Sequence, residues 1–155
     1  MKTKTTRFGE IEVEESTIIE FVQPIIGFPE HKSFVLLPTS EDSPFVWLQS
    51  TEDPELAFIV VDTLRIMPDY NIELPASEVE DVQIEKEEDA LLMTLVVIAG
   101  GGEVRTNLKA PIVLNKIKNL AKQVILPQDD YPVRYVLKKG ATEEREETSD
   151  ARSDA

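Results

Sequence analysis

The sequence predicts an all-β fold with at most one or two short helices, namely a small antiparallel barrel or sandwich with Greek-key-like connections. Short runs of β-branched and aromatic residues recur along the chain, and turn-forming residues separate them. No long segment repeats its apolar residues with the 3.6-residue period of an amphipathic helix. The most apolar run, residues 91–99, shows no alternation, which is typical of a strand covered on both faces.

The first part of the chain predicts strands arranged in hairpins. Residues 2–13 form a hairpin in this interpretation, because Gly9 marks a turn and Ile11 and Val13 then alternate with glutamates. The strands expected next are residues 18–21, 34–37, 45–50 and 56–61. The last two are separated by a short turn at residues 52–54, so we expect them to pair with each other.

The second part of the chain predicts the helix and the remaining strands. Residues 75–82 are the best helical candidate, because Pro75 suits a first helical turn and Ala76, Val79 and Val82 recur at helical spacing. The further strands expected are residues 71–74, 91–99, 112–114, 123–126 and 133–137. The triple glycine at 100–102 ends the central strand with a flexible turn.

The composition changes completely near Lys138. Residues 141–155 contain acidic, hydroxyl, arginine and alanine residues and no large apolar side chain. We therefore expect one domain over residues 1–138, followed by a disordered acidic tail over residues 139–155.

Composition and charge restrict the function. The chain has no cysteine, which excludes disulfides, thiolate metal sites and cysteine nucleophiles. It carries 30 acidic and 16 basic residues, a formal net charge of −14, so its field repels nucleic acids and anionic membranes and favours encounter with basic proteins. No apolar core of a signal sequence appears in residues 1–20, and no apolar run approaches the length of a membrane span, so we expect a soluble, cytoplasmic protein.

The motifs of catalysis and metal binding are not apparent in the sequence. His31 is the only histidine, and its charged neighbours indicate a solvent-exposed turn. The carboxylates at residues 85–89 lack the spacing of a calcium loop, and no Gly-Lys-Ser/Thr follows the glycines at 100–102 to make a phosphate loop. We expect no enzyme activity, no cofactor and no metal.

Two short stretches supply candidate contact residues, although each also has a structural reading. Phe45 and Trp47 lie on one face of an expected strand and are either core residues or aromatic anchors of an interface. Lys109 lies two residues before Pro111, at the entrance of a strand, and is either a surface lysine at a turn or a cationic contact for a partner. Asn107 and Asn115 flank this segment as expected turn or capping residues.

The order of several motifs resembles the bacterial flagellar assembly factor family FliW. The matching segments are residues 6–10, 27–28, 44–50, 53–54, 56–58, 106–115, 123–126 and 131–134. Asn-Leu-Lys-Ala-Pro at residues 107–111 is the most specific of them. The chain departs from the family pattern at residues 21–24, where a Phe-Pro-x-Gly stretch is common, and at the glycines at 100–102, where polar residues and proline are usual.

This resemblance implies a small β-barrel-like adaptor, monomeric when free, that binds two alternative protein partners. One is flagellin, held in the cytoplasm before export. The other is the basic RNA-binding repressor CsrA, which the adaptor captures after flagellin has left, so that translation of flagellin mRNA resumes. The resemblance implies neither direct nucleic-acid binding nor a membrane association. It implies partner contacts by the motif residues, for which our candidates are Phe45, Trp47, Asn107, Lys109, Ala110 and Pro111.

Two other functions remain compatible with the residues alone. A β-barrel that binds a small ligand or hydrolyses a substrate would need an enclosed pocket with convergent polar groups, for example around Asn107 and Lys109. A purely structural scaffold would bind neither partner.

Overall fold

The structure is a computed structural model that describes residues 2–38, 43–127 and 131–138. The expected acidic tail, residues 139–155, lies outside the described residues. Its disorder and the domain boundary at residue 138 therefore stay predictions.

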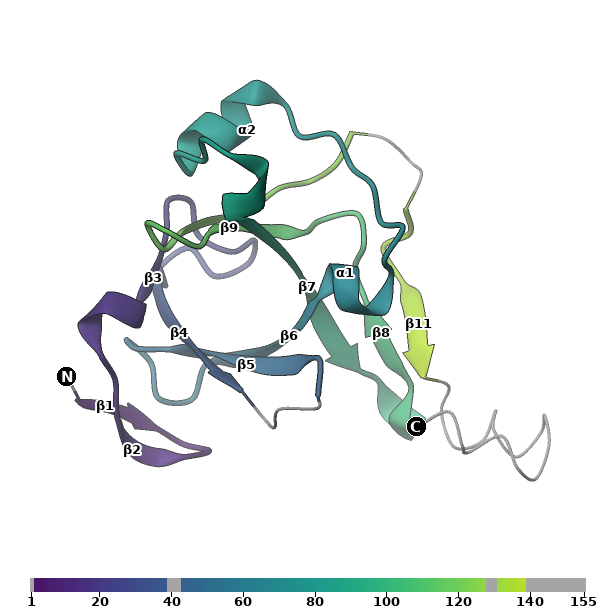
Figure 1. The fold of residues 1–155 in the computed structure, drawn as a ribbon. Helices are drawn as coiled ribbons and strands as arrows, with labels where there is room; N and C mark the ends of the chain where they lie inside the picture. The colour runs from purple at the N-terminus through teal and green to yellow at the C-terminus, as the bar shows by residue number, and fades with distance from the viewer. Residues whose placement is uncertain (1, 39–42, 128–130, 139–155) are drawn as a thin grey trace.

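Seven strands close into a barrel, in the order β7-β6-β5-β4-β3-β10-β9 and back to β7 (Figure 1). Their bounds are β3 Ile19–Phe21, β4 Ser33–Pro38, β5 Phe45–Ser50, β6 Ala57–Asp62, β7 Ala90–Ile98, β9 Ile112–Asn115 and β10 Leu120–Gln123. The α-helices of the described residues are short, α1 Thr63–Ile66 and α2 Ala76–Asp81. The expected all-β class is confirmed, and its closed form is a barrel rather than a sandwich.

One pairing in this barrel is parallel, although the sequence predicts an antiparallel fold. Strand β3 pairs with β10 in parallel, with Glu20 opposite Leu120 and Phe21 opposite Ala121, while the other barrel pairings are antiparallel. A closed ring with an odd number of strands cannot alternate direction throughout, so at least one neighbouring pair must run parallel. The parallel pair lies where two hairpins of the chain, β3–β4 and β9–β10, meet to close the barrel.

The barrel interior is filled by alternate residues of these strands. Phe21 and Phe34 are fully buried and meet edge to face with ring centroids 5.3 Å apart. Leu48 and Val60 are also fully buried, in the same cluster as Ile112. Because successive side chains of a strand point to opposite faces, the neighbours of Leu48 and Val60 point to the outside of the barrel.

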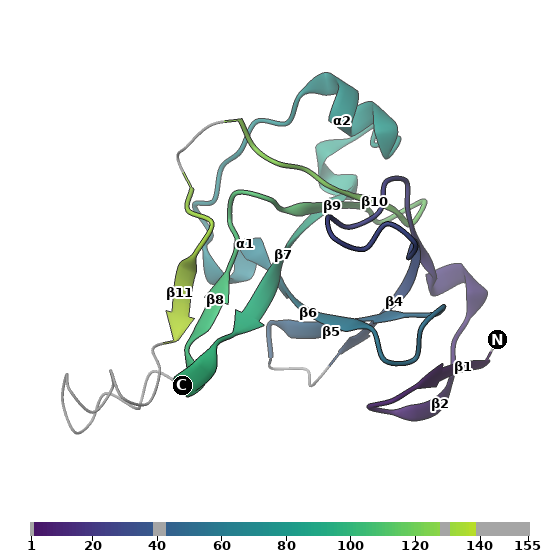
Figure 2. The ribbon, with the colours of Figure 1, turned by 180° about the vertical axis from the view of Figure 1, so that it is seen from behind.

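Strand β7 extends beyond the closed barrel. Its first half pairs with β9, and its second half pairs along the same edge with β8, Val104–Thr106, which in turn pairs with β11, Tyr135–Lys138 (Figure 2). Here the expectation of a strand covered on both faces is wrong, because Val97 and Ile98 are 53% and 60% exposed. Among the described residues, the extension carries two short strands, and no second layer of structure covers its apolar end.

The segment between β6 and β7, residues 63–89, is an insert that contains both α-helices. Helix α2 agrees with the predicted helix, whereas the single turn of α1 is not predicted. The strand expected at residues 71–74 is wrong. Ile72 and Leu74 instead pack against a second buried cluster around Val82, and the backbone N–H and C=O of Asn71 bond to the hydroxyl of Tyr131.

The N-terminal hairpin forms a small sheet of its own beside the barrel. Strands β1, Lys2–Thr5, and β2, Gly9–Glu12, pair as expected. Short 3₁₀ turns occupy residues 15–17, 87–89 and 100–102. No helix in the described ranges is long and apolar enough to cross a membrane.

The strand expected at residues 123–126 begins three residues earlier, as β10. The chain nevertheless stays extended past the end of β10. The N–H groups of Val124 and Leu126 donate to the carbonyl oxygens of Pro111 and Lys109, at 2.8 Å each. Lys109 and Pro111 are therefore held by the continuation of β10.

Candidate partner-binding surfaces

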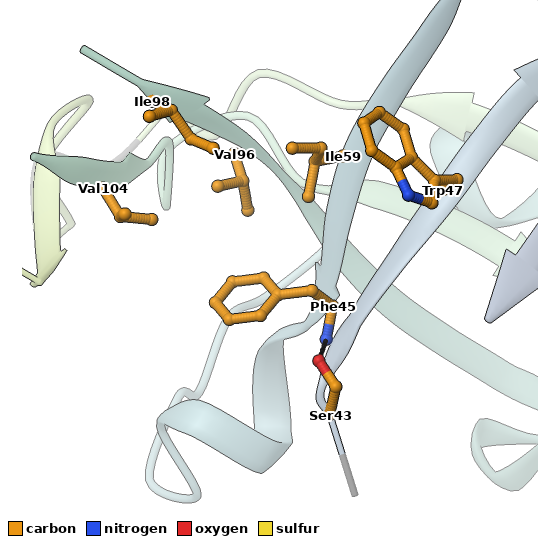
Figure 3. A pocket seen from close by; sticks show the side chains of 7 residues that line it. All are labelled: Ser43, Phe45, Trp47, Ile59, Val96, Ile98 and Val104. Carbon is orange, nitrogen blue, oxygen red and sulfur yellow. Dashed lines mark hydrogen bonds between the residues drawn. The ribbon is translucent and has the colours of Figure 1, made fainter. Parts of the chain in front are cut away.

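An apolar groove lies on the outside of the barrel, across strands β5 to β8. Its volume is about 280 Å³, and we call it the outer groove; it is lined by Ser43, Phe45, Trp47, Ile59, Val96, Ile98 and Val104 (Figure 3). The strand register explains this gathering, because Trp47 lies opposite Ile59, Ile59 opposite Val96, and Ile98 opposite Val104. Residues paired across neighbouring strands share a face, so the outward positions of four strands form one continuous apolar surface.

The N-terminal hairpin holds the aromatic end of the outer groove in place. The ring of Phe8 meets Trp47 edge to face at 6.2 Å, and the Arg7 guanidinium lies 4.5 Å from the centroid of the Trp47 ring. The turn that carries both residues is closed by Thr5, whose hydroxyl accepts a hydrogen bond from the Phe8 N–H at 2.8 Å. Trp47 is therefore half-buried by a second element, and the groove has one fixed wall.

A second groove, of about 490 Å³, lies on the opposite face of β7. We call it the loop groove; it is lined by Ile26, Leu95, Asn107, Lys109, Ala110, Gln123, Ile125 and Val133. Ile26 and Ile125 are 59% and 61% exposed, so the groove opens onto the surface. It is not the enclosed pocket around Asn107 and Lys109 that a small-ligand function would need.

The segment at residues 107–111 is a fixed excursion from the sheet. Thr106 pairs with Val96 and Ile112 pairs with Met93, so five residues of this segment stand opposite two residues of β7. The Oδ1 atom of Asn107 accepts a hydrogen bond from the Lys109 N–H at 3.0 Å, which confirms the expected turn role of this asparagine. The excursion thereby brings Lys109 and Ala110 to the wall of the loop groove.

Asn115 also has the expected capping role, at the other end of β9. Its Oδ1 accepts hydrogen bonds from the N–H groups of Ile117 and Lys118, and its Nδ2 donates to the carbonyl oxygens of Val82 and Gln83. Asn115 therefore joins the turn between β9 and β10 to the end of helix α2.

The structure divides the six candidate residues between two surfaces. Phe45 and Trp47 line the outer groove, whereas Asn107, Lys109 and Ala110 line the loop groove. Pro111 is buried, and its carbonyl oxygen accepts a hydrogen bond from the Val124 N–H, so its role is structural. Lys109 is half-buried rather than a fully exposed surface lysine.

The sequence analysis does not single out the groove residues on β7 and β8, namely Val96, Ile98 and Val104. A signal for them does exist in the sequence. The apolar run at residues 91–99 is long for a strand of a small barrel. The surplus length is the part of β7 that leaves the barrel and lines the outer groove.

His31 differs from the expectation of a solvated histidine. It is half-buried, and its Nδ1 atom is shielded from solvent and forms no hydrogen bond with the described residues. The next two backbone N–H groups, of Lys32 and Ser33, donate to Oε1 of Glu52 at 2.9 and 3.0 Å. These two bonds lower the pKa of the Glu52 carboxyl below its ordinary value, so Glu52 stays charged and fixes the turn.

The walls of the two grooves are largely apolar, with a few side-chain hydrogen-bonding groups such as Asn107 and Gln123 in the loop groove. Among the described residues no group of three His, Asp or Glu side chains is placed to hold a metal ion.

Comparison with known proteins identifies the family of this chain. The family model described as FliW protein matches residues 2–137. The chain belongs to the FliW family of flagellar assembly factors. A flagellar assembly factor FliW of Syntrophus aciditrophicus is 42% identical over 140 residues, which cover 90% of the chain and 89% of the relative. The corresponding protein of Geobacter sulfurreducens is 43% identical over 136 residues, with 87% and 85% covered.

The fold of the FliW family is also known from a solved structure. A crystal structure of the flagellar assembly factor FliW superposes with a TM-score of 0.81 at 37% identity. The superposition covers 91% of this chain and 99% of the other. The fold of this chain is therefore that of the FliW family.

Proposed function

We propose that this protein binds flagellin in the cytoplasm before export and, when free, binds and antagonises a CsrA-type RNA-binding repressor. The repression of flagellin mRNA is thereby relieved once flagellin has been exported. Membership of the FliW family supports this proposal, and the outer groove is the observation in the structure that carries it.

The outer groove suits an apolar segment of flagellin that orders on binding. Its wall combines two aromatic side chains, Phe45 and Trp47, with the exposed Ile98. Buried aromatic and aliphatic anchors in a preformed groove contribute most of the binding energy in many protein interfaces. Trp47 is already packed against Phe8 and Arg7, so little side-chain freedom remains to be lost when a partner binds.

The net charge of −14 suits the second partner, a basic repressor. It raises the encounter rate through long-range attraction and makes the affinity depend on salt. The same charge disfavours direct contact with RNA. The family resemblance, and not the charge, supports a contact outside the RNA-contacting surface of the repressor. The proposed role is therefore regulated protein binding and not catalysis.

A direct test is to titrate each purified partner into the full-length protein by calorimetry at low and at high salt. We expect saturable binding of monomeric flagellin with weak salt dependence, and binding of the repressor that weakens as salt increases. Absence of binding to either protein at micromolar concentration would overturn the proposal.

A further inference from the structure

A third concave surface lies beneath the insert, away from both grooves. This insert pocket has a volume of about 530 Å³, and its apolar wall contains Leu64, Ile72, Leu74, Val79, Ile84 and Leu92. Glu85, Lys86 and Glu87 stand at its rim and are exposed. A pocket of this size lies within the range of about 300–1,000 Å³ that is common for binding sites.

The insert is also where the negative charge of the protein is concentrated. Residues 73–89 contain eight of the 30 acidic residues and a single lysine. Lys122 forms ion pairs with two of the eight, Glu78 and Asp81. Of the other six, Glu85 and Glu87 line the apolar pocket, on either side of Lys86 in the sequence, and make its rim net negative.

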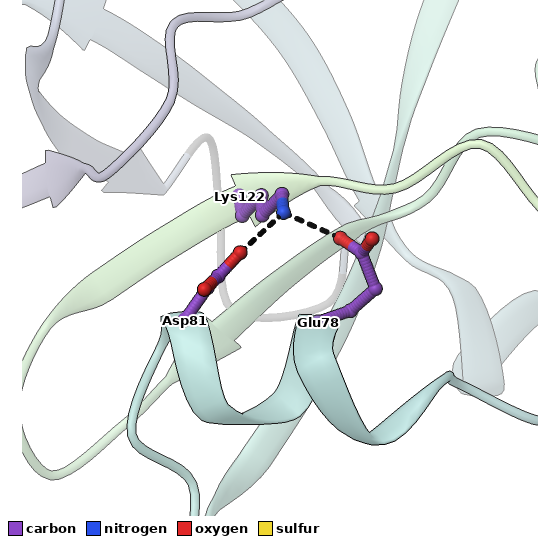
Figure 4. Close-up of polar contacts among 3 residues, drawn as sticks. All are labelled: Glu78, Asp81 and Lys122. Atoms are coloured by element: carbon purple, nitrogen blue, oxygen red, sulfur yellow. Dashed lines mark hydrogen bonds and ion pairs between the residues drawn. The ribbon is translucent and has the colours of Figure 1, made fainter.

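The pocket wall is held rigidly against the barrel. The buried Lys122 ammonium lies 2.6 Å from Oε1 of Glu78 and 2.6 Å from Oδ2 of Asp81, which fixes helix α2 on strand β10 (Figure 4). Tyr70 also lines the pocket, and its hydroxyl donates to the carbonyl oxygen of Leu108 at 2.6 Å. A wall fixed at two points binds a partner with little loss of conformational entropy.

We propose that the insert pocket is the docking site for a basic protein segment, in which an apolar side chain enters the pocket between Lys or Arg residues that face Glu85 and Glu87. The charge complementarity of the rim selects this occupant over an acidic or neutral one. This inference rests on the proposed function, in which the basic repressor is the partner of this chemistry.

The site is separate from the outer groove but close to it along the chain. Ile59 of strand β6 lines the outer groove, and Leu64 of helix α1, five residues later, lines the insert pocket. The two surfaces have no lining residue in common, so each can be altered by substitution without changing the other.

Two variants and two matched controls test this docking site in the full-length protein. Glu85→Lys/Glu87→Lys reverses the rim charge, whereas Glu14→Lys/Glu15→Lys makes the same change in net charge at exposed residues around the turn after β2. Leu64→Gln removes an apolar contact from the pocket wall, and Ile117→Gln makes the same change on the β9–β10 turn; the two side chains are 46% and 71% exposed. Thermal melts establish that all four variants are folded.

The readout is the affinity for the repressor and, separately, for flagellin. We expect the rim reversal to lower the affinity for the repressor by about tenfold or more, and Leu64→Gln to lower it by several-fold. The repressor affinity of both controls, and the flagellin affinity of all four variants, should stay within about twofold of wild type. Equal losses of repressor affinity in the two charge variants would show that only the long-range electrostatic field matters. Unchanged repressor affinity in both pocket variants would show that the repressor does not bind at the pocket. Either result overturns the inference while the proposed function stands.

Two further results would have different consequences. Failure of the wild-type protein to bind the repressor overturns the inference together with that half of the proposed function. Analytical sedimentation of the same variants tests whether the pocket is instead occupied by a second copy of this chain. A change in self-association caused by the pocket variants alone, without loss of repressor binding, would place that copy in the pocket and overturn the inference.

Discussion

The hydroxyl of Tyr70 donates a 2.6 Å hydrogen bond to the carbonyl oxygen of Leu108, which joins the insert to the family segment at residues 107–111. Both residues are buried, and the Tyr70 ring packs against Tyr131 with centroids 4.6 Å apart. Burial, together with the neighbouring Tyr131, raises the pKa of the Tyr70 phenol, so it remains a donor at neutral pH. The insert pocket and the loop groove thus share one structural connection.

Replacing Tyr70 by phenylalanine tests this connection. The Leu108 carbonyl would lose its partner in a buried position, and we expect Tyr70→Phe to lower the free energy of unfolding by roughly 1–2 kcal/mol. Urea denaturation measures the change. Tyr135→Phe on β11 is the matched control and is expected to have a smaller effect; equal effects of the two substitutions would contradict the role of the Tyr70 bond.

Replacing Lys122 by methionine tests the attachment of helix α2. Methionine keeps the apolar stem packed but leaves Glu78 and Asp81 without their cation, and we expect a loss of roughly 2 kcal/mol at neutral pH. The loss is moderate because both carboxylates are partly exposed. An unchanged urea midpoint would show that the α2 attachment does not depend on this ion-paired group.

The same variant has a defined pH dependence. The bonds to Asp81 and then to Glu78 raise the pKa of Lys122 above its ordinary value of 10.5. A raised lysine pKa contributes stability that is fully present below that ordinary value and is lost as pH rises through the folded-state pKa. We therefore expect the stability difference between wild type and Lys122→Met to be constant near neutral pH and to shrink above about pH 10.5. A difference that grows in alkali would contradict this sign.

A charge placed on the end of strand β7 tests the outer groove. Ile98 is 60% exposed, so Ile98→Asp is expected to leave the melting temperature nearly unchanged. The affinity for flagellin should fall by about tenfold or more, because flagellin binding would have to desolvate an unpaired carboxylate. Ile117→Asp on the β9–β10 turn, where the native side chain is 71% exposed, is the control. Equal flagellin affinity of both variants would move the flagellin site away from the outer groove.

The loop groove has its own test at Lys109. We expect Lys109→Ala to weaken the binding of at least one partner by several-fold, since the side chain lines the groove, while the protein remains folded. Lys116→Ala, on the exposed turn after β9, removes the same charge elsewhere. Calorimetry with both partners decides, and unchanged affinities for both would assign Lys109 to the scaffold.

The barrel strands could be predicted from the sequence because local alternation and turn residues agree there with the final packing. In the hairpin of β5 and β6, Leu48 and Val60 enter the core, and Trp47 and Ile59 point outward, as period-two alternation requires. The polar roles of Asn107 and Asn115 could also be predicted, because their side chains bond to backbone groups only two or three residues away.

The errors of prediction occur where distant segments decide the structure. Ile72 and Leu74 alternate like a strand, but the second cluster takes up their side chains, and Tyr131, 60 residues away, bonds to the backbone of Asn71. The apolar end of β7 has the composition of a core strand. Its exposure arises because the partner on one edge of β7 changes from β9 to β8, which cannot be predicted from local sequence. The division of the candidate residues between two grooves likewise depends on which face of β7 each neighbour covers.

The most direct measurement of the proposed partner switch uses a fluorescent flagellin leader RNA bound to the CsrA-type repressor. We expect this protein to release the RNA in a saturable manner and flagellin, added afterwards, to restore the RNA–repressor complex. Release that flagellin cannot reverse, or RNA that stays bound at saturating concentrations of this protein, would contradict the account.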